Sequence, residues 1–321
     1  MKFFTTLITA FVLSQSVYAD KLGSKPLKVF ILAGQSNMQG QGIVTSQDEQ
    51  GRELPGTLLA TLRNPAKAPM LKHLVNAKGE WQEKRADVWI YDISEIGKRH
   101  GLLQFGYGWD LGSRSWFGPE LQFGHVLGDQ LTNQVLIIKT AWGGRDLYKD
   151  FRPPSSGGKV GPFYTDMIRT VKKVLSSLDK EFPGKIGTNY KIEGFVWWHG
   201  WNDYCSPTQA APQYEKNLTN LIKDVRRDLK VPKLPVIIGE FAGPWGADCT
   251  DPTALVIRKA QKRVAQKAEF AGTVKFVETH DFVRTEIESP SDEIYHEFKN
   301  GETYFLIGDA FGKGMGELLK K

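Results

Sequence analysis

The stretch VFILAGQSNM, residues 29–38, decides the fold class. Four apolar residues and an alanine lead directly into a polar turn, a pattern typical of a buried strand in the middle of a parallel sheet. Open α/β sheets place their chemistry at the carboxyl ends of such strands. Ser36 is the first side chain there that could act as a nucleophile. The turn could equally be a helix start capped by Ser36 or Asn37, and this stretch alone does not decide between the two.

Four further segments have the length and apolar content of short buried strands: 134–141, 193–199, 235–240 and 273–278. Helical patterns lie between or after them, at 119–131, 163–178, 210–229, 255–267 and 302–319. Strands that alternate with helices predict a parallel sheet covered on both faces. Right-handed crossovers then place all the carboxyl ends at one edge of the sheet.

The N-terminus has the features of an export signal. Lys2 gives a positive start, residues 3–13 are largely apolar, and Val17 and Ala19 offer the small residues that a signal peptidase reads. A buried N-terminal helix is the alternative. We predict a signal peptide over residues 1–19, hence a periplasmic or secreted protein. No later segment is long and apolar enough to span a bilayer, so no integral membrane segment is expected after cleavage.

Residues 20–321 are predicted to form a single domain, a normal size for an α/β enzyme with insertions. The segment from about 44 to 117 breaks the alternation of strands and helices and is read as a long insertion. It is rich in proline and glycine, and residues 88–91 suggest a small hairpin or extended strand within it. Long loops in compact domains often serve as lids or binding walls.

Composition excludes several function classes. The formal charge is +6, but the basic residues gather on predicted helix faces without a recognition motif, so a solvated surface is favoured over nucleic-acid binding. No cluster of His, Cys, Asp and Glu has metal-ligand spacing and no phosphate-binding loop is apparent, so no cofactor is predicted. Cys205 and Cys249 both follow predicted strand ends. In an exported protein they are predicted to form a disulfide, worth about 3–4 kcal/mol.

Groups suited to acyl transfer recur at the predicted strand ends. The first strand ends in GQSN (34–37), FGPE (117–120) precedes a helix, the third strand ends in WWHGWND (197–203), and DEIYH (292–296) lies near the C-terminus. A serine hydroxyl needs a base such as histidine to become nucleophilic. The tetrahedral intermediate needs N–H donors aimed at its oxygen.

Taken together, these four blocks resemble those of the SGNH/GDSL hydrolase superfamily. Within it the chain is similar to the carbohydrate-esterase branch that includes sialate O-acetylesterases and acetylxylan esterases, over nearly the whole mature chain. The resemblance implies a flavodoxin-like three-layer α/β/α sandwich with a five-stranded parallel sheet. It implies a serine esterase that removes O-acetyl groups from an oligo- or polysaccharide through an acetyl-enzyme. A lipase or thioesterase of the superfamily, and a carbohydrate-binding protein that has lost catalysis, are the alternatives.

The resemblance also implies residue roles. Ser36 would be the nucleophile and His296 the general base. The backbone N–H groups of Ser36 and Gly118, with the Asn202 side chain, would form the oxyanion hole. The superfamily usually has an aspartate three residues before the histidine. This chain has Glu293 there with Asp292 one residue earlier, so either carboxylate or a backbone carbonyl could orient His296.

Contacts with the sugar are assigned more broadly. Gln35, Trp201 and Trp142 lie at strand ends, where an aromatic ring can stack on a sugar; ordinary packing is the alternative for the tryptophans. Arg145 could pair with a substrate carboxylate or with a neighbouring acid. His199 stands where the branch often has glutamine, and could contact substrate or be a packed, hydrogen-bonded residue.

Overall fold

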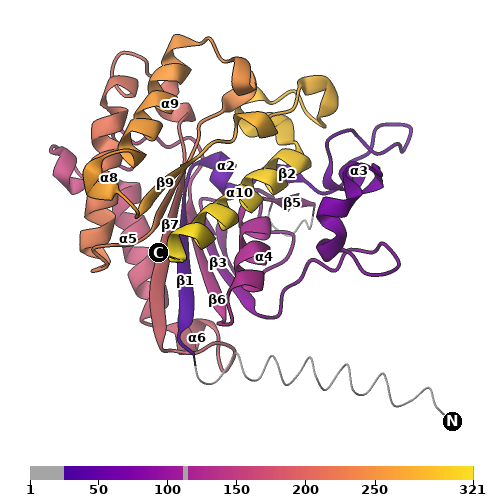
Figure 1. Ribbon diagram of the computed structural model, residues 1–321, viewed down its shortest axis with the longest axis horizontal. Coiled ribbons are helices and arrows are strands. Elements are labelled where there is room, and N and C mark those ends of the chain that lie inside the picture. The colour runs from indigo at the N-terminus through magenta and orange to yellow at the C-terminus, as the bar shows by residue number, and fades with distance from the viewer. Residues whose placement is uncertain (1–24, 111–114, 321) are drawn as a thin grey trace.

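A computed structural model describes residues 25–110 and 115–320 (Figure 1). The predicted signal peptide, residues 1–19, lies outside the described residues. Within them the chain forms a seven-stranded sheet in the spatial order β4-β3-β6-β1-β7-β8-β9. The strands are β1 Leu27–Gly34, β3 Val88–Ser94, β4 Gly97–Leu102, β6 Val135–Ala141, β7 Tyr190–Trp198, β8 Val236–Gly239 and β9 Val274–Val277. A separate antiparallel pair joins β2 Gly42–Ile43 to β5 Trp116–Phe117.

The five predicted strands are neighbours in this sheet, in the order β6-β1-β7-β8-β9, and every pair among them is parallel. This is the flavodoxin-like order, in which the chain leaves β1 for one side of the sheet and later returns to its other side. The loops after β1 and its neighbours therefore part at the carboxyl end of β1 and leave a crevice there. The predicted α/β sandwich is confirmed.

The sheet is two strands wider than the sequence predicted. Segment 44–117 supplies β3, which pairs parallel to β6, and β4, which pairs antiparallel to β3. The apolar run of β3 gave a signal for extended structure. The sequence of β4, GKRHGL, did not indicate a strand. It is a charged edge strand that is held in place by its hairpin turn and not by burial of its side chains.

Helices cover both faces of the sheet (Figure 1). The longer ones are α4 Glu120–Gln130, α5 Pro162–Leu175, α8 Tyr214–Asp228, α9 Pro252–Ala265 and α10 Gly301–Leu319. The short ones are α2 Ser36–Gln39, α3 Leu58–Arg63, α6 Leu178–Glu181 and α7 Trp201–Tyr204. Single 3-10 segments lie at Ala68–Leu74, Pro154–Ser156, Ala211–Gln213, Gly243–Asp248, Ala268–Phe270, His280–Phe282, Glu286–Glu288 and Ile294–Lys299. Among residues 25–110 and 115–320, none of the helices is apolar over a length that would cross a bilayer.

The alternation of side chains along β1 divides the core into two parts. Val29 and Ile31 face α5, α8 and α9, whereas Phe30 and Leu32 face α4 and α10. All four side chains are at most 1% exposed. A strand buried on both faces reads as a continuous apolar run, which is why residues 29–33 carry no polar residue.

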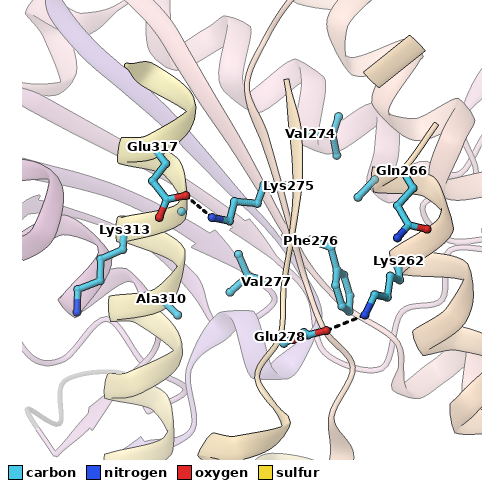
Figure 2. Close-up of a pocket in the computed structure, with 12 residues that line it drawn as sticks. Lys262, Gln266, Val274, Lys275, Phe276, Val277, Glu278, Ala310, Lys313 and Glu317 are labelled. Carbon is cyan, nitrogen blue, oxygen red and sulfur yellow. Dashed lines mark hydrogen bonds and ion pairs between the residues drawn. The ribbon is translucent and has the colours of Figure 1, made fainter. Parts of the chain in front are cut away.

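The outer edge of β9 lies in a groove of about 570 Å³ between α9 and α10 (Figure 2). Two ion pairs flank the strand, Lys275 with Glu317 and Lys262 with Glu278. Charged side chains along an edge strand oppose pairing with another chain. None of the predicted site residues lies in this groove.

A buried lysine joins the sheet to the segments around it. Lys139 on β6 is fully buried, and its Nζ lies 2.7 Å from the Gln39 carbonyl oxygen at the end of α2. The same nitrogen lies 3.1 Å from Glu120 Oε2 and 3.5 Å from Asp92 Oδ1, and it donates to the Tyr107 carbonyl. A single ammonium group thus connects α2, α4, β3 and the insertion.

Replacing this lysine should be costly. Lys139→Met keeps the side chain's approximate length but leaves Glu120 buried without its cation, whereas Asp92 keeps its ion pair with Arg99. The change should lower the free energy of unfolding by roughly 3–5 kcal/mol. Urea denaturation monitored by circular dichroism measures the change. Lys262→Met, which breaks an exposed ion pair, is the control and should leave the midpoint nearly unchanged. Equal midpoints for both variants would contradict this account of Lys139.

Candidate active site

A cavity of about 520 Å³ lies at the carboxyl ends of β1, β6 and β7. Five of the predicted site residues line it: Gln35, Ser36, Trp201, Asn202 and His296. They come from three loops far apart in the sequence. The strand order β6-β1-β7 brings these loops together, as expected for the crevice where an open α/β sheet binds ligands.

Ser36 is presented by a tight strand-to-helix turn. It is the first residue of α2 and directly follows Gln35, the last residue before the helix. Gly34 makes this turn possible, since a Cβ on Gly34 would lie 2.1 Å from the Trp198 carbonyl oxygen on β7. The backbone N–H of the first helical residue has no partner within its own helix. Ser36 therefore offers both a hydroxyl and an N–H at the cavity.

His296 is held by a carboxylate on its far side. Its Nδ1 lies 2.7 Å from Glu293 Oε2, while Asp292 is exposed to solvent. Glu293 is therefore the carboxylate in place to orient the ring, as the three-residue spacing suggested. Among the described residues no hydrogen bond joins Ser36 to His296, although both line the cavity. Such contacts are often long in enzymes without substrate and tighten in the complex.

The local charges set the protonation of this pair. Burial lowers the pKa of His296, and the opposing effect of the Glu293 carboxylate does not fully offset it. Burial alone would raise the pKa of Glu293, but hydrogen bonds from Lys299 and His296 lower it overall. Near neutral pH the structure therefore pairs a neutral imidazole with an ionised carboxylate.

The chain after His296 adopts an uncommon backbone conformation. Glu297, Phe298 and Lys299 have φ values of 50°, 53° and 57°, the left-handed region that costs non-glycine residues free energy. This left-handed turn redirects the chain into α10, whose first turn is capped by the Asn300 side chain, 3.1 Å from the Thr303 N–H. Tertiary contacts must hold the turn, because its own residues do not favour it.

One of those contacts connects the turn to α2. The Tyr304 hydroxyl, on α10, lies 3.3 Å from the His296 carbonyl oxygen and 2.8 Å from Asn37 Oδ1. Asn37 follows Ser36 directly in the sequence. The two halves of the site are thus linked through a buried tyrosine beneath them.

Gln35 fixes the orientation of Asn202. Its Oε1 accepts the Gly200 N–H at 3.0 Å and its Nε2 donates to Asn202 Oδ1 at 3.3 Å. Because the Asn202 oxygen receives this hydrogen bond, the amide nitrogen is the end left to donate into the cavity. Gln35 is only 2% exposed. It was predicted as a substrate contact, and the structure makes it mainly a support for Asn202.

The structure does not place Gly118 in the cavity. Its N–H donates to Glu120 Oε1 at 2.9 Å, and a Cβ on Gly40 would meet its Cα at 2.4 Å. The FGPE motif instead packs α4 against the end of α2 and positions Glu120 for Lys139. Gly118 is therefore not available as the predicted oxyanion donor, because its N–H already donates to Glu120 within the buried network.

The glycines at this edge of the cavity are Gly143 and Gly144. They follow β6, the parallel neighbour of β1, so the sheet order brings them beside Ser36. A Cβ on Gly143 would lie 3.7 Å from Ser36 Cβ. The strand over 134–141 was predicted from the sequence. Because functional groups gather at the carboxyl ends of such strands, the glycine pair that follows it could have been predicted to form this wall.

Two of the predicted sugar contacts are packing residues. Trp142 is 7% exposed and packs against Phe151 and Phe163. The Arg145 guanidinium lies 4.5 Å from the Phe163 ring centroid, a cation–π contact. Neither side chain lines the cavity. These predictions were wrong because the residues follow β6 on the side of the loop that faces α5.

His199 is likewise a structural residue. Its ring is stacked between Trp197 and Tyr214, with Nε2 2.9 Å from the Arg145 carbonyl oxygen. Burial lowers its pKa to about 4, so it stays neutral at physiological pH. Of the two alternatives, the packed and hydrogen-bonded one describes His199.

The predicted disulfide is absent. Cys205 and Cys249 are free thiols; Cys205 is exposed on the cavity wall, and Cys249 is partly buried before α9. Partial burial raises the pKa of the Cys205 thiol. Their strand-end loops lie at the same edge of the sheet as predicted, but the sulfur atoms are not bonded.

Three further residues of the cavity wall were not among the predicted site residues. Glu95, in the β3–β4 turn, accepts the Gln39 side-chain N–H at 2.7 Å and the Gly143 N–H at 3.1 Å. Trp109 and Tyr295 are 38% and 48% exposed at the rim. Glu95 and Trp109 belong to the insertion, whose path over the sheet could not be inferred from its composition.

The described part of the chain holds no group of three or more His, Cys, Asp or Glu side chains arranged to bind a metal ion.

Comparison with known proteins shows to which family the chain belongs. Residues 26–291 match the family described as carbohydrate esterase, sialic acid-specific acetylesterase. The chain belongs to this family. It is thus a carboxylic ester hydrolase of the carbohydrate esterase class, and the resemblance read from its four sequence blocks is confirmed.

One relative found by sequence and two solved structures agree with this assignment. A probable carbohydrate esterase of Arabidopsis thaliana is 25% identical over 222 residues, 69% of this chain and 71% of that protein. A crystal structure of an Arabidopsis thaliana protein matches with a TM-score of 0.57 at 18% identity, over 91% of this chain and 98% of that one. A carbohydrate acetylesterase from Xanthomonas citri matches with a TM-score of 0.53 at 12% identity, over 89% and 57%. The two structures establish the shared fold.

This carbohydrate esterase has a buried acid, Glu297, whose charged form is not stabilised by its neighbours enough to offset burial. Glu297 is 3% exposed, and burial raises its pKa to about 8. Arg258 on α9 lowers this pKa and Glu240 raises it. Glu240 itself is occupied by the His280 ring, 2.8 Å away. Glu297 thus keeps its proton at neutral pH.

This acid should make the esterase less stable as the pH rises. The native carboxyl holds its proton up to about pH 8, whereas in the unfolded chain it loses it near the ordinary value of 4.5. Between these values the native state binds the extra proton, so the free energy of unfolding should fall by up to about 1.4 kcal/mol per pH unit from this group.

Glu297→Gln should remove that contribution. Denaturant unfolding measured from pH 4 to 9 should give a shallower fall with pH for the variant than for the wild type, with the largest difference above pH 8. Measurements near pH 4 serve as the control, because both side chains are uncharged there. Parallel curves for the two proteins across the range would contradict the assignment.

Proposed function

We propose that this carbohydrate esterase removes O-acetyl groups from carbohydrate through an acetyl-enzyme intermediate. One observation carries the proposal: Ser36 and His296 line the same cavity, with Glu293 Oε2 2.7 Å from His296 Nδ1. This is the arrangement in which a base activates a serine and a carboxylate orients the base.

The reaction proceeds in two steps. His296 takes the Ser36 hydroxyl proton as Oγ attacks the acetyl carbonyl carbon, and the resulting imidazolium faces the Glu293 carboxylate. Collapse of the tetrahedral intermediate breaks the bond to the sugar oxygen, which receives the proton from His296. Water, activated by His296 in turn, attacks the acetyl-enzyme and releases acetate. No other reactant is needed.

Three groups are suited to stabilise the oxyanion. The Ser36 backbone N–H and the Asn202 amide nitrogen border the cavity, and Gln35 holds the amide so that its nitrogen faces inward. We assign the third donor to the Gly144 N–H in place of Gly118, since the Gly143 N–H already donates to Glu95. Each such donor is worth about 3–4 kcal/mol in the transition state.

Several observations favour a short acyl group on a sugar. Gln35, Asn202 and Glu95 supply polar groups to the cavity wall, and Trp109 and Tyr295 at the rim offer faces on which sugar rings stack. The family description and the Xanthomonas citri relative both name acetylesterases. The sequence of residues 1–19 further leads us to propose that the enzyme is exported to the periplasm or secreted.

Ser36→Ala should abolish turnover. Loss of the nucleophile should reduce acetate release from an acetylated sugar or an activated acetyl ester by at least about a thousandfold while the circular dichroism spectrum stays unchanged. Ser176→Ala, at an exposed position after α5, is the matched control and should keep full activity. A covalent serine probe should label Ser36 in the wild type.

Wild-type turnover in the Ser36 variant would refute the assignment. Sugar binding without labelling or acetate release would indicate a binding protein instead, and a rate that rises with acyl chain length would indicate a lipase or thioesterase.

The dependence of kcat/KM on pH tests the proposed role of His296 as the base. Since burial lowers the pKa of His296, kcat/KM for an acetyl ester should be constant near neutral pH and fall on acidification with a midpoint below 6.5. Glu293→Gln removes the carboxylate that raises this pKa, so the midpoint should move lower and the plateau should drop by at least about tenfold. Asp292→Asn, at an exposed neighbouring position, is the control. An unchanged plateau in Glu293→Gln would exclude Glu293 from the triad.

A further inference from the structure

The glycine pair on the wall of the active-site cavity is not held in place by side-chain packing of its own. Gly144 has a φ of 68°, in the left-handed region, and a Cβ placed on it would meet no described atom within 4 Å. Two successive glycines form a backbone that no side chain restricts. The peptide between Gly143 and Gly144 could therefore turn over at little steric cost. Its N–H is the third oxyanion donor of the proposed function, so other contacts must fix its direction.

Glu95 holds this turn from one side. Its Oε1 accepts the Gly143 N–H at 3.1 Å, and its Oε2 accepts the Gln39 side-chain N–H at 2.7 Å. One carboxylate oxygen is thus engaged by the turn and the other by the short helix that begins at Ser36. A Cβ on Gly143 would lie 2.9 Å from Glu95 Oε1 and 3.1 Å from Gln39 Oε1. The carboxylate comes this close because residue 143 has no side chain.

The sheet brings Glu95 to this place. β3 pairs parallel to β6, with Ile93 opposite Thr140. Glu95 follows Ile93 by two residues and Gly143 follows Thr140 by three, so both come directly after neighbouring strands at one edge of the sheet. Glu95 is also one of the two residues that connect β3 to β4. A two-residue hairpin connection has a defined turn geometry, which fixes the backbone that carries this carboxylate.

The segment after β7 holds the turn from its other side. The His199 Nε2 lies 2.9 Å from the Arg145 carbonyl oxygen, and Asp203 Oδ2 accepts the Leu147 N–H at 2.7 Å. Both of these side chains are at most 3% exposed. The turn is therefore anchored immediately before and shortly after Gly144. Within the part of the chain that the structure describes, no hydrogen bond uses the Gly144 N–H itself, so this donor is left for the cavity.

We propose that Glu95 is a positioning residue of the esterase: its carboxylate fixes the Gly143 N–H and thereby directs the next N–H, that of Gly144, toward the oxyanion. The proposal rests on the proposed function, because it concerns one donor of that reaction. Glu95 acts as a hydrogen-bond acceptor and not through its charge, since a negative charge near the oxyanion would oppose the reaction. It lies in the insertion, outside the four sequence blocks on which the resemblance was based.

Two substitutions separate the hydrogen bond from the charge. Glu95→Ala removes the acceptor, so kcat for 4-nitrophenyl acetate should fall roughly ten- to a hundredfold with KM within about threefold of the wild type, the effect of a misplaced transition-state donor. Glu95→Gln keeps an oxygen for the Gly143 N–H. Its amide nitrogen can donate to Gln39 Oε1, a buried oxygen without a partner among the described residues, once the Gln39 amide rotates. This variant should keep kcat within about twofold of the wild type.

Two controls accompany these variants. The midpoint of the pH dependence of kcat/KM should be the same in both as in the wild type, because the hydrogen bonds of Glu95 go to Gly143 and Gln39 and not to the His296–Glu293 pair. Glu49→Ala, the same substitution at an exposed position of the insertion, should leave kcat and KM unchanged.

Three kinetic results would overturn the proposal. Wild-type kcat in Glu95→Ala would mean that the turn needs no such support, and an equal loss in both variants would make the charge responsible. A higher KM at unchanged kcat would make Glu95 a substrate contact instead.

The proposed function fails separately, if 4-nitrophenyl acetate turnover does not depend on Ser36. Amide hydrogen exchange measured by NMR then decides the role of Glu95. Faster exchange of the Gly143 N–H in Glu95→Ala than in Glu95→Gln supports the positioning role, and equal exchange in the two variants overturns it.

Discussion

The buried ammonium of Lys139 is the interaction on which the site depends. A charge in the core is tolerated only when it is fully paired, and Lys139 is paired with two carboxylates and two backbone carbonyls. The carbonyl of Gln39 closes the short helix that begins with Ser36, so the lysine fixes that helix to the sheet. The carbonyl of Tyr107 belongs to the insertion, so the same charge draws the insertion toward the cavity that it helps to form.

The other half of the site is held by different means. His296 precedes three residues in the left-handed region, a conformation that the local sequence would not adopt alone. Tyr304 and the capped start of α10 anchor it from below, while the Glu293–Lys299 ion pair bridges it from the side. These contacts hold the imidazole at the wall of the cavity that Ser36 also lines. The core of the sheet thus positions Ser36, and a constrained loop positions His296.

The parts that were predictable from the sequence share a physical cause. The five parallel strands and their helices follow from apolar runs and helical periodicity, both of which report burial directly. Ser36, Asn202 and His296 were predicted to lie at one edge of the sheet, and the structure brings all three to one cavity. Glu293 was preferred to Asp292 for its three-residue spacing, and it is the carboxylate that contacts His296. β4 and the wall formed by Glu95 and Trp109 were missed, because an exposed hairpin is fixed by turn geometry and long-range pairing that leave no periodic signal.

The groups that the structure turns away from the cavity share a cause as well. Gly118, His199, Trp142 and Arg145 have residue types that suit a site, but the side chain or N–H is committed elsewhere: to Glu120, to the Arg145 carbonyl, to Phe151, or to Phe163. A motif identifies the family, whereas the direction of each group depends on the residues around it. The family match ends at residue 291, before Glu293, His296 and Lys299. The contact between Glu293 and His296 therefore lies beyond the residues that the family model matches, and it is known from the structure and not from the family description.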